Sequence, residues 1–366
     1  MRKYKITPHF FNACDIMLDD VGYIKQHDRS GMIELIRRLP ADIKDAVQNA
    51  RHLDLPLFYP DLTKDSIRNV VISGMGGSGI CGDILRDALS EELSIPIIVN
   101  KSARLPAFVN ENSLLILVSY SGNTREILSQ FDAGFNRKIP MVVISSGGTL
   151  EGNARANEVP VIKLPDGYPP RAALPHLLFS VYITLEQVGL VGMFDPSQTI
   201  KTVKRLGTLL VPEMGVSRNI AKQCALKLRG LTPYIYIWER YGAVADRWRT
   251  QLNENAKIMA VSGVFPEMNH NEIVGWESEF DPHPAALLLR TEDEPAAILK
   301  RMEFSTHLFK RKGRLIEIYA EGNTPLEKML SLIYIGDYAS VYLAVMNEID
   351  PTPVNIIEDL KKALEK

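Results

Sequence analysis

Two short apolar segments of this 366-residue chain each run directly into a loop of glycine and hydroxyl residues. Residues 70–73 (Val-Val-Ile-Ser) enter Gly-Met-Gly-Gly-Ser-Gly at 74–79, and residues 114–118 (Leu-Leu-Ile-Leu-Val) enter Ser-Tyr-Ser-Gly-Asn-Thr at 119–124. This pattern is typical of a buried parallel strand that passes through a loop into a helix. Since carboxyl ends of parallel strands share one edge of a sheet, we expect an α/β protein with both loops at that edge.

Both loops have the composition of an anion-binding site. Glycines such as Gly77 allow the backbone to approach a ligand closely, and the free N–H groups at the start of a helix point at it. Ser78, Ser119, Ser121 and Thr124 add neutral hydrogen-bond donors. Neither loop contains a lysine, so backbone amides and hydroxyl groups are expected to bind a phosphate group.

The first loop does not fully match either of two well-known nucleotide-binding motifs. Its glycines at 74, 76 and 79 match the Gly-x-Gly-x-x-Gly pattern of dinucleotide-binding folds, but Asn100 and Lys101 stand where an acidic residue should hold the ribose. A P-loop is excluded because Ile80 and Cys81 replace its lysine and hydroxyl residue. For either loop alone, an ordinary strand-to-helix turn remains the alternative.

Charge and cysteine content narrow the class of protein. The 42 basic and 44 acidic residues nearly balance, which argues against a nucleic-acid partner. Cys14, Cys81 and Cys224 are widely spaced and odd in number, so we expect free thiols in a reducing compartment. The N-terminus lacks the apolar core of a signal peptide, and His176, Glu186 or prolines break the longest apolar stretches. A cytoplasmic protein without a membrane partner is expected.

The sequence predicts two αβα sandwich domains, each with a mainly parallel, roughly five-stranded sheet. Residues 1–60 are predicted to form a helical lead-in, residues 61–205 the first domain and residues 206–366 the second. The first domain has expected strands near 70–73, 95–99, 114–119, 140–145 and 160–164; the second has them near 233–238, 285–290 and 314–319. Because the second half lacks glycine-serine loops, the first half should bind the anion and the second should supply chemistry.

The two hydroxyl-rich loops resemble those of the sugar isomerase domain, a family that binds phosphosugars. The similarity extends to residues 168–174 (Tyr-Pro-Pro-Arg-Ala-Ala-Leu), 252–257 (Leu-Asn-Glu-Asn-Ala-Lys), 268–272 (Met-Asn-His-Asn-Glu), 335–338 (Ile-Gly-Asp-Tyr) and 350–354 (Asp-Pro-Thr-Pro-Val). The set and order of these motifs resemble the bifunctional phosphoglucose/phosphomannose isomerases. The resemblance runs from about residue 65 to the C-terminus.

This resemblance implies an aldose-ketose isomerase of glycolysis and gluconeogenesis. Such an enzyme interconverts glucose 6-phosphate or mannose 6-phosphate with fructose 6-phosphate through ring opening and a cis-enediol intermediate. It works as a homodimer and needs neither a cofactor nor a metal. The seven histidines also form no spaced ligand pair with cysteine or carboxylate, which argues against a metal site.

The resemblance also implies a role for each matching residue. Glu254 would move a proton between C1 and C2, His270 would assist ring opening, and Arg171 would face the enediolate oxygen. Thr352 would line the C1–C2 end of the sugar, where a short side chain admits either C2 epimer. A lysine of the last helix also approaches the sugar; Lys361 or Lys362 fits, and the spacing does not decide between them.

Without the resemblance, Glu254 would be a solvated helix glutamate beside Lys257, and His270 an incidental loop residue. The apolar stripe of this helix, through Val244, Trp248, Leu252 and Ala256, leaves Glu254 on another face with Arg247 and Gln251.

Two other functions remain open. A phosphosugar-binding sensor would keep the anion loops without chemistry, although the presence of all three catalytic candidates argues against it. A dinucleotide-dependent oxidoreductase is disfavoured by Asn100 and Lys101.

We further expect each active site of the homodimer to combine Glu254 and Arg171 of one chain with His270 of the other. Residues 261–266 (Val-Ser-Gly-Val-Phe-Pro), which precede His270, form an apolar run better suited to a contact surface than to solvent.

Overall fold

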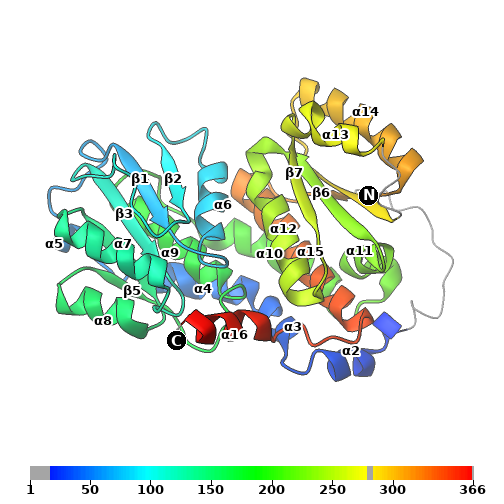
Figure 1. The fold of residues 1–366 in the computed structure, drawn as a ribbon, viewed down its shortest axis with the longest axis horizontal. Helices are drawn as coiled ribbons and strands as arrows, with labels where there is room; N and C mark the ends of the chain where they lie inside the picture. The colour runs from blue at the N-terminus through cyan, green and yellow to red at the C-terminus, as the bar shows by residue number, and fades with distance from the viewer. Residues whose placement is uncertain (1–16, 278–282, 365–366) are drawn as a thin grey trace. The chain divides into compact units, whose positions relative to one another are not determined.

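The computed structural model describes residues 17–277 and 283–364, and the chain divides into two compact units (Figure 1). The first unit is Arg38–Lys201, and the second combines Met1–Arg37 with Thr202–Lys366. The predicted lead-in of residues 1–60 therefore contributes to both units. Cys14 lies outside the described residues.

The first unit contains the predicted five-stranded parallel sheet, in the order β2-β1-β3-β4-β5. Its strands are β1 (Asn69–Ser73), β2 (Ile97–Asn100), β3 (Ser113–Val118), β4 (Met141–Ser145) and β5 (Val161–Lys163). Its helices are α4 (Leu39–Ala50), α5 (Leu55–Phe58), α6 (Ile80–Ala88), α7 (Arg125–Asn136), α8 (Gly148–Ala156) and α9 (Leu174–Gln187). Strand β3 is buried along its whole length, as the continuous apolar run predicts.

The second unit contains a parallel sheet of four described strands in the order β7-β6-β8-β9. They are β6 (Thr232–Trp238), β7 (Val261–Phe265), β8 (Pro284–Arg290) and β9 (Arg314–Tyr319). The sequence analysis missed β7, because this short edge strand contains Ser262 and Gly263 and is only partly buried. Residues 261–265 thus belong to the sheet itself.

Helices of the second unit include α2 (Val21–His27), α3 (Met32–Arg37), α11 (Ile220–Leu228), α12 (Gly242–Ala256), α13 (Glu272–Gly275), α14 (Ala296–Lys312), α15 (Pro325–Met346) and α16 (Asn355–Leu364). Helix α10 (Pro196–Leu210) contains the boundary between the units.

Helix α15 forms the centre of the second unit. Helices α11 and α12 pack against it, and a Cβ atom at Gly336 would lie 2.4 Å from the ring of Trp248, so only glycine allows this close approach. Within the described residues, this 22-residue helix alone has the length and composition to cross a membrane, contrary to the expected interruption of apolar stretches. Its most apolar window is 94% buried inside the protein, which is typical of a core helix.

Candidate active site

The first glycine loop closes a tight turn between β1 and α6. A Cβ atom at Gly74 would lie 2.7 Å from the carbonyl oxygen of Ser78, and one at Gly79 would lie 2.5 Å from that of Gly74. Gly76 has a φ of +52°, which residues with a side chain rarely adopt. The glycine pattern is therefore required by the turn itself.

The two predicted anion loops are joined at the carboxyl edge of the first sheet. The Ser78 hydroxyl accepts a hydrogen bond from the backbone N–H of Tyr120 at 3.2 Å, and the hydroxyl oxygens of Ser119 and Thr124 lie 3.0 Å apart. Ser78 and Ser119 are buried, Thr124 is half-buried, and Ser121 is exposed. The structure thus brings Ser78, Ser119 and Thr124 together where the two loops meet, and the Ser121 hydroxyl accepts a hydrogen bond from the N–H of Asn123 at 3.4 Å in the second loop.

Arg171 lies beside the first of these loops. A Cβ atom at Gly77 would be 2.9 Å from the backbone nitrogen of Arg171, so the first loop and the arginine segment touch through their backbones. The Tyr120 hydroxyl accepts a hydrogen bond from the N–H of Tyr168 at 2.9 Å and donates one to the carbonyl of Pro165. Arg171 itself is only 2% exposed. A residue with a permanent positive charge is therefore buried, and its backbone contacts the first predicted phosphate loop.

A buried carboxylate fixes the segment before Arg171. The Tyr168 hydroxyl lies 3.1 Å from both side-chain oxygens of Asp42, and Arg38 pairs with the same carboxylate at 3.2 Å. Burial and the charge of Asp42 raise the pKa of Tyr168 to about 12, so its hydroxyl remains a donor at neutral pH. The sequence analysis missed Asp42, although a lone aspartate on the otherwise apolar face of α4 was an available signal.

Glu254 lies half-buried in the last turn of α12 in the second unit. The predicted apolar stripe is confirmed, since Val244, Trp248, Leu252 and Ala256 are all buried. Arg247 and Gln251 are buried as well, and Arg247 binds Asp337 through two hydrogen bonds of 3.2 and 3.0 Å. Glu254 therefore continues a buried polar face of the helix.

The loop that contains Thr352 lies beside the end of this helix. Lys257 ends α12 in a left-handed conformation, and its ammonium group donates hydrogen bonds to the carbonyl oxygens of Glu254 and, at 3.1 Å, Pro351. Thr352 is half-buried, and its backbone N–H binds the Asp350 side chain at 3.1 Å. Glu254 and Thr352 thus lie at the same edge of the second unit.

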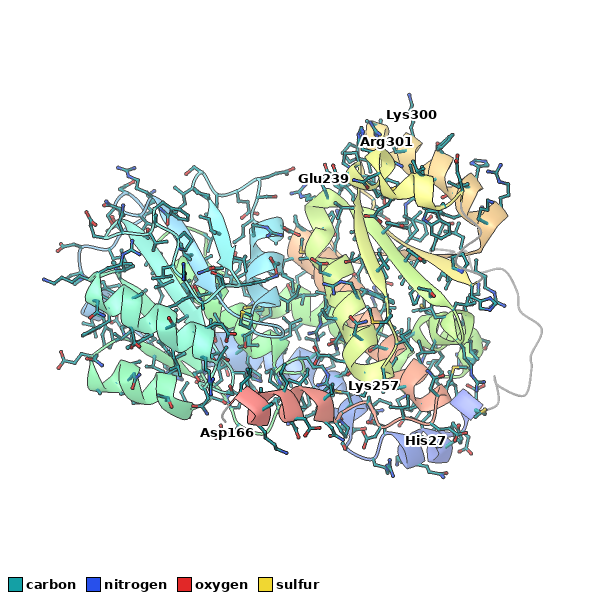
Figure 2. The ribbon with its side chains drawn as sticks, in the orientation of Figure 1. His27, Asp166, Glu239, Lys257, Lys300 and Arg301 are labelled. Atoms are coloured by element: carbon teal, nitrogen blue, oxygen red, sulfur yellow. The ribbon has the colours of Figure 1, made fainter. Side chains whose placement is uncertain are left out.

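His270 lies at the opposite end of the strands of the second sheet, beyond the carboxyl end of β7. Helix α12 runs back from the carboxyl end of β6 to the amino end of β7, whereas His270 is exposed in a 3₁₀ turn (Glu267–His270) that follows β7. Figure 2 shows Glu239 and Lys257 near the two ends of α12. The structure therefore separates Glu254 from His270 within one chain.

The C-terminal lysines lie on α16, whose residues are exposed. Lys362 forms an ion pair with Asp359 at 3.8 Å, and nothing in the structure favours Lys361 over it. Among the residues that the structure describes, no group of three histidine, cysteine, aspartate or glutamate side chains could hold a metal ion.

Two α/β units, each with a parallel sheet, define a protein of the sugar isomerase class, and the first of them carries joined hydroxyl loops beside a buried arginine. Residues 217–364 match the family described as "Bacterial phospho-glucose isomerase C-terminal SIS domain". A bifunctional phosphoglucose/phosphomannose isomerase from Caldicellulosiruptor bescii is 37% identical over 340 residues, which are 91% of this chain and 98% of the relative. This chain belongs to the family of bifunctional phosphoglucose/phosphomannose isomerases.

Two further comparisons agree with this assignment. A relative of the same name from Aquifex aeolicus is 32% identical and aligns over 84% of this chain and 94% of its own length. The crystal structure of a glucose-6-phosphate isomerase-like protein from Thermus thermophilus superimposes with a TM-score of 0.60 and 19% identity, covering 94% of this chain and 98% of that one. The structural likeness confirms the fold.

Proposed function

We propose that this chain interconverts glucose 6-phosphate or mannose 6-phosphate with fructose 6-phosphate. The observation that carries the proposal is the close approach of Gly77 to the backbone of the buried Arg171, at the point where the two hydroxyl-rich loops meet. Hydroxyls and helix N–H groups suit a phosphate, and the cation suits a negative charge that develops nearby. The names of the relatives support the same reaction. The proposal includes a cytoplasmic place in glycolysis and gluconeogenesis.

In the proposed mechanism the phosphate binds to Gly77, Ser78, Ser119, Ser121 and Thr124. His270 passes a proton between the ring oxygen and the C1 hydroxyl, which opens the ring. Glu254 then moves a proton between C1 and C2: it removes the proton from one of these carbons and delivers it to the other. Arg171 stabilises the cis-enediolate between these steps, because a fixed positive charge is most effective where negative charge develops.

The proposal requires a homodimer with shared sites. Within one chain, Glu254 lies near the amino end of β7 and His270 lies beyond its carboxyl end. The five residues of β7 between them span about 16 Å. A single sugar ring is too small to contact both. The surface near His270 also exposes an apolar side chain, since Val274 of α13 is 65% exposed. A second copy of the chain is the partner that supplies the missing histidine.

The test is a coupled assay of fructose 6-phosphate formation from each aldose phosphate, combined with exchange of the C2 proton in deuterated water. An isomerase gives both product and exchange. Tight binding of the phosphosugars with no exchange would instead identify the sensor.

A further inference from the structure

Lys101 approaches the first glycine loop from the neighbouring strand. Strand β2 pairs with β1 so that Asn100 aligns with Ser73, and the next residue therefore stands beside the start of the loop. The Cε atom of Lys101 would lie 3.4 Å from a Cβ atom at Gly79, and its Nζ atom lies 2.5 Å from Oδ2 of Asp83. The loops contain no lysine of their own, but this packing brings one to them.

The backbone of Lys101 is held by a buried network. The Asn100 side chain donates to Gln130 at 2.8 Å and accepts a hydrogen bond from the N–H of Ser102 at 3.2 Å. Gln130 is fully buried and donates to the carbonyl of Ser102 at 2.5 Å. Since both neighbours of Lys101 are fixed, its side chain starts from a defined position above the amino end of α6.

Asp83 makes the charge of Lys101 important at this place. This carboxylate is 5% exposed in the first turn of α6, close to the loop predicted to bind phosphate. It would repel a phosphate dianion unless cations neutralise it. Arg86 binds its Oδ1 atom at 3.1 Å, and Lys101 lies against its Oδ2 atom while remaining 47% exposed. The ammonium group can therefore face both the carboxylate and a bound anion.

We propose that Lys101 is a binding residue for the phosphate group of the ligand, and that Asp83, which pairs with its ammonium group, offsets part of its positive charge. This inference rests on the proposed function, because it extends the same phosphate site. Hydroxyls and amides would fix the orientation of the phosphate, and Lys101 would supply its positive counter-charge. The carboxylate partly cancels that charge, so the two side chains should act on phosphate affinity in opposite directions.

The test compares Lys101→Met, Asp83→Asn and Lys64→Met. Lys64 is an exposed lysine in the turn before β1, at the other edge of the sheet, and serves as the charge-matched control. Lys101→Met should raise KM for the hexose phosphates roughly three- to tenfold with little change in kcat, because the attraction is lost equally from substrate and transition state. Asp83→Asn should lower KM, and Lys64→Met should leave it unchanged.

Two further measurements separate this role from a structural one. Raising NaCl from about 50 to about 300 mM should increase KM less for Lys101→Met than for the wild type, because one screened attraction is missing. If both variants of the Lys101–Asp83 pair raise KM, or if the effect follows their melting temperatures, the pair only supports the loop and the inference is wrong. Lys101→Arg keeps the charge and should retain most affinity.

Inorganic phosphate tests the inference without any assay of catalysis. It should raise the melting temperature of the wild-type protein, and the shift should be smaller for Lys101→Met and larger for Asp83→Asn. Equal shifts in all three proteins would overturn the role of Lys101 even in an active isomerase. An inactive wild type with the expected order of shifts would overturn the proposed reaction and leave Lys101 as an anion-binding residue.

Discussion

Glu254 is a carboxylate that can act as a base while its helix stays intact. It is half-buried at the end of α12, and the hydrogen bond from Lys257 to its residue goes to the backbone carbonyl. Glu254→Gln should therefore preserve the melting temperature and phosphosugar binding. Because an amide cannot accept the C–H proton, kcat should fall on the order of 10²–10⁴-fold. Steady-state kinetics with both aldose phosphates measure this, and Glu303→Gln, on the exposed face of α14, is the control. Near-normal turnover would remove Glu254 from the mechanism.

The residues of the candidate site differ in how far sequence could predict them. The hydroxyls at 119–124 could be predicted because they belong to one continuous segment after a strand. Asp42 stands out in the sequence only as a lone aspartate on an apolar helix face, and Lys101 not at all, because their importance depends on what tertiary packing places beside them: Tyr168 for the first and Gly79 for the second. Local pattern carries no information about such neighbours.

At the scale of the elements, a substitution of Thr124 tests phosphate binding without changing the stability of helix α7. It precedes α7 as the N-cap residue, yet its side chain makes no capping hydrogen bond; its hydroxyl lies 3.0 Å from that of Ser119. Thr124→Ala should therefore leave the melting temperature nearly unchanged and raise KM, because a phosphate contact is retained from the ground state to the transition state. Ser121→Ala should behave alike. A fall in kcat at unchanged KM would show that the anion binds elsewhere.

Asp28, whose side chain caps the start of α3, makes the free energy of unfolding depend on pH. Its carboxylate accepts hydrogen bonds from the N–H groups of Met32 and Ile33 at 2.8 and 2.9 Å. Burial outweighs these bonds and raises its pKa from 3.8 to about 6. The folded chain therefore binds a proton between pH 4 and 6 that the unfolded chain lacks, so wild-type stability from this group falls as pH rises through that window, by at most about 3 kcal/mol.

The variant Asp28→Asn lacks this titration. Its free energy of unfolding, measured by urea denaturation, should increase relative to that of the wild type as the pH is raised from 4 to 7. Asp45→Asn, at an exposed position of α4, is the matched control and should show no such trend. A constant difference across the range would mean that Asp28 keeps its ordinary pKa.

The strands of the first unit were predictable because each contains a short apolar run, the longest of them in β3. Strand β7 was not, since its edge position leaves Val261 exposed and tolerates a glycine at 263. Topology carried a usable signal: a helix that leaves one parallel strand must return before the next, and α12 therefore predicts a strand soon after Lys257.

At the scale of the whole molecule, the opposite positions of Glu254 and His270 lead to a complementation experiment. Glu254→Gln and His270→Ala proteins, each nearly inactive, are unfolded together, mixed and refolded. In the proposed homodimer, a mixed dimer has one site with both lesions and one with neither. Random pairing makes about half of the dimers mixed, so activity should return to about a quarter of wild type.

The control pair is Glu254→Gln mixed with Arg171→Met. The proposal takes both residues of each site from the same chain, so every site of this mixed dimer carries one lesion and no activity should return. Native mass spectrometry establishes that mixed dimers form in both experiments. No recovery in the first pair despite mixed dimers would show that the assignment of His270 to the partner chain is wrong. Recovery in the control pair would show instead that Glu254 and Arg171 of one site come from different chains. Recovery in the first pair alone would support the proposed position of His270 across the interface from Glu254, from which the length of β7 separates it within one chain.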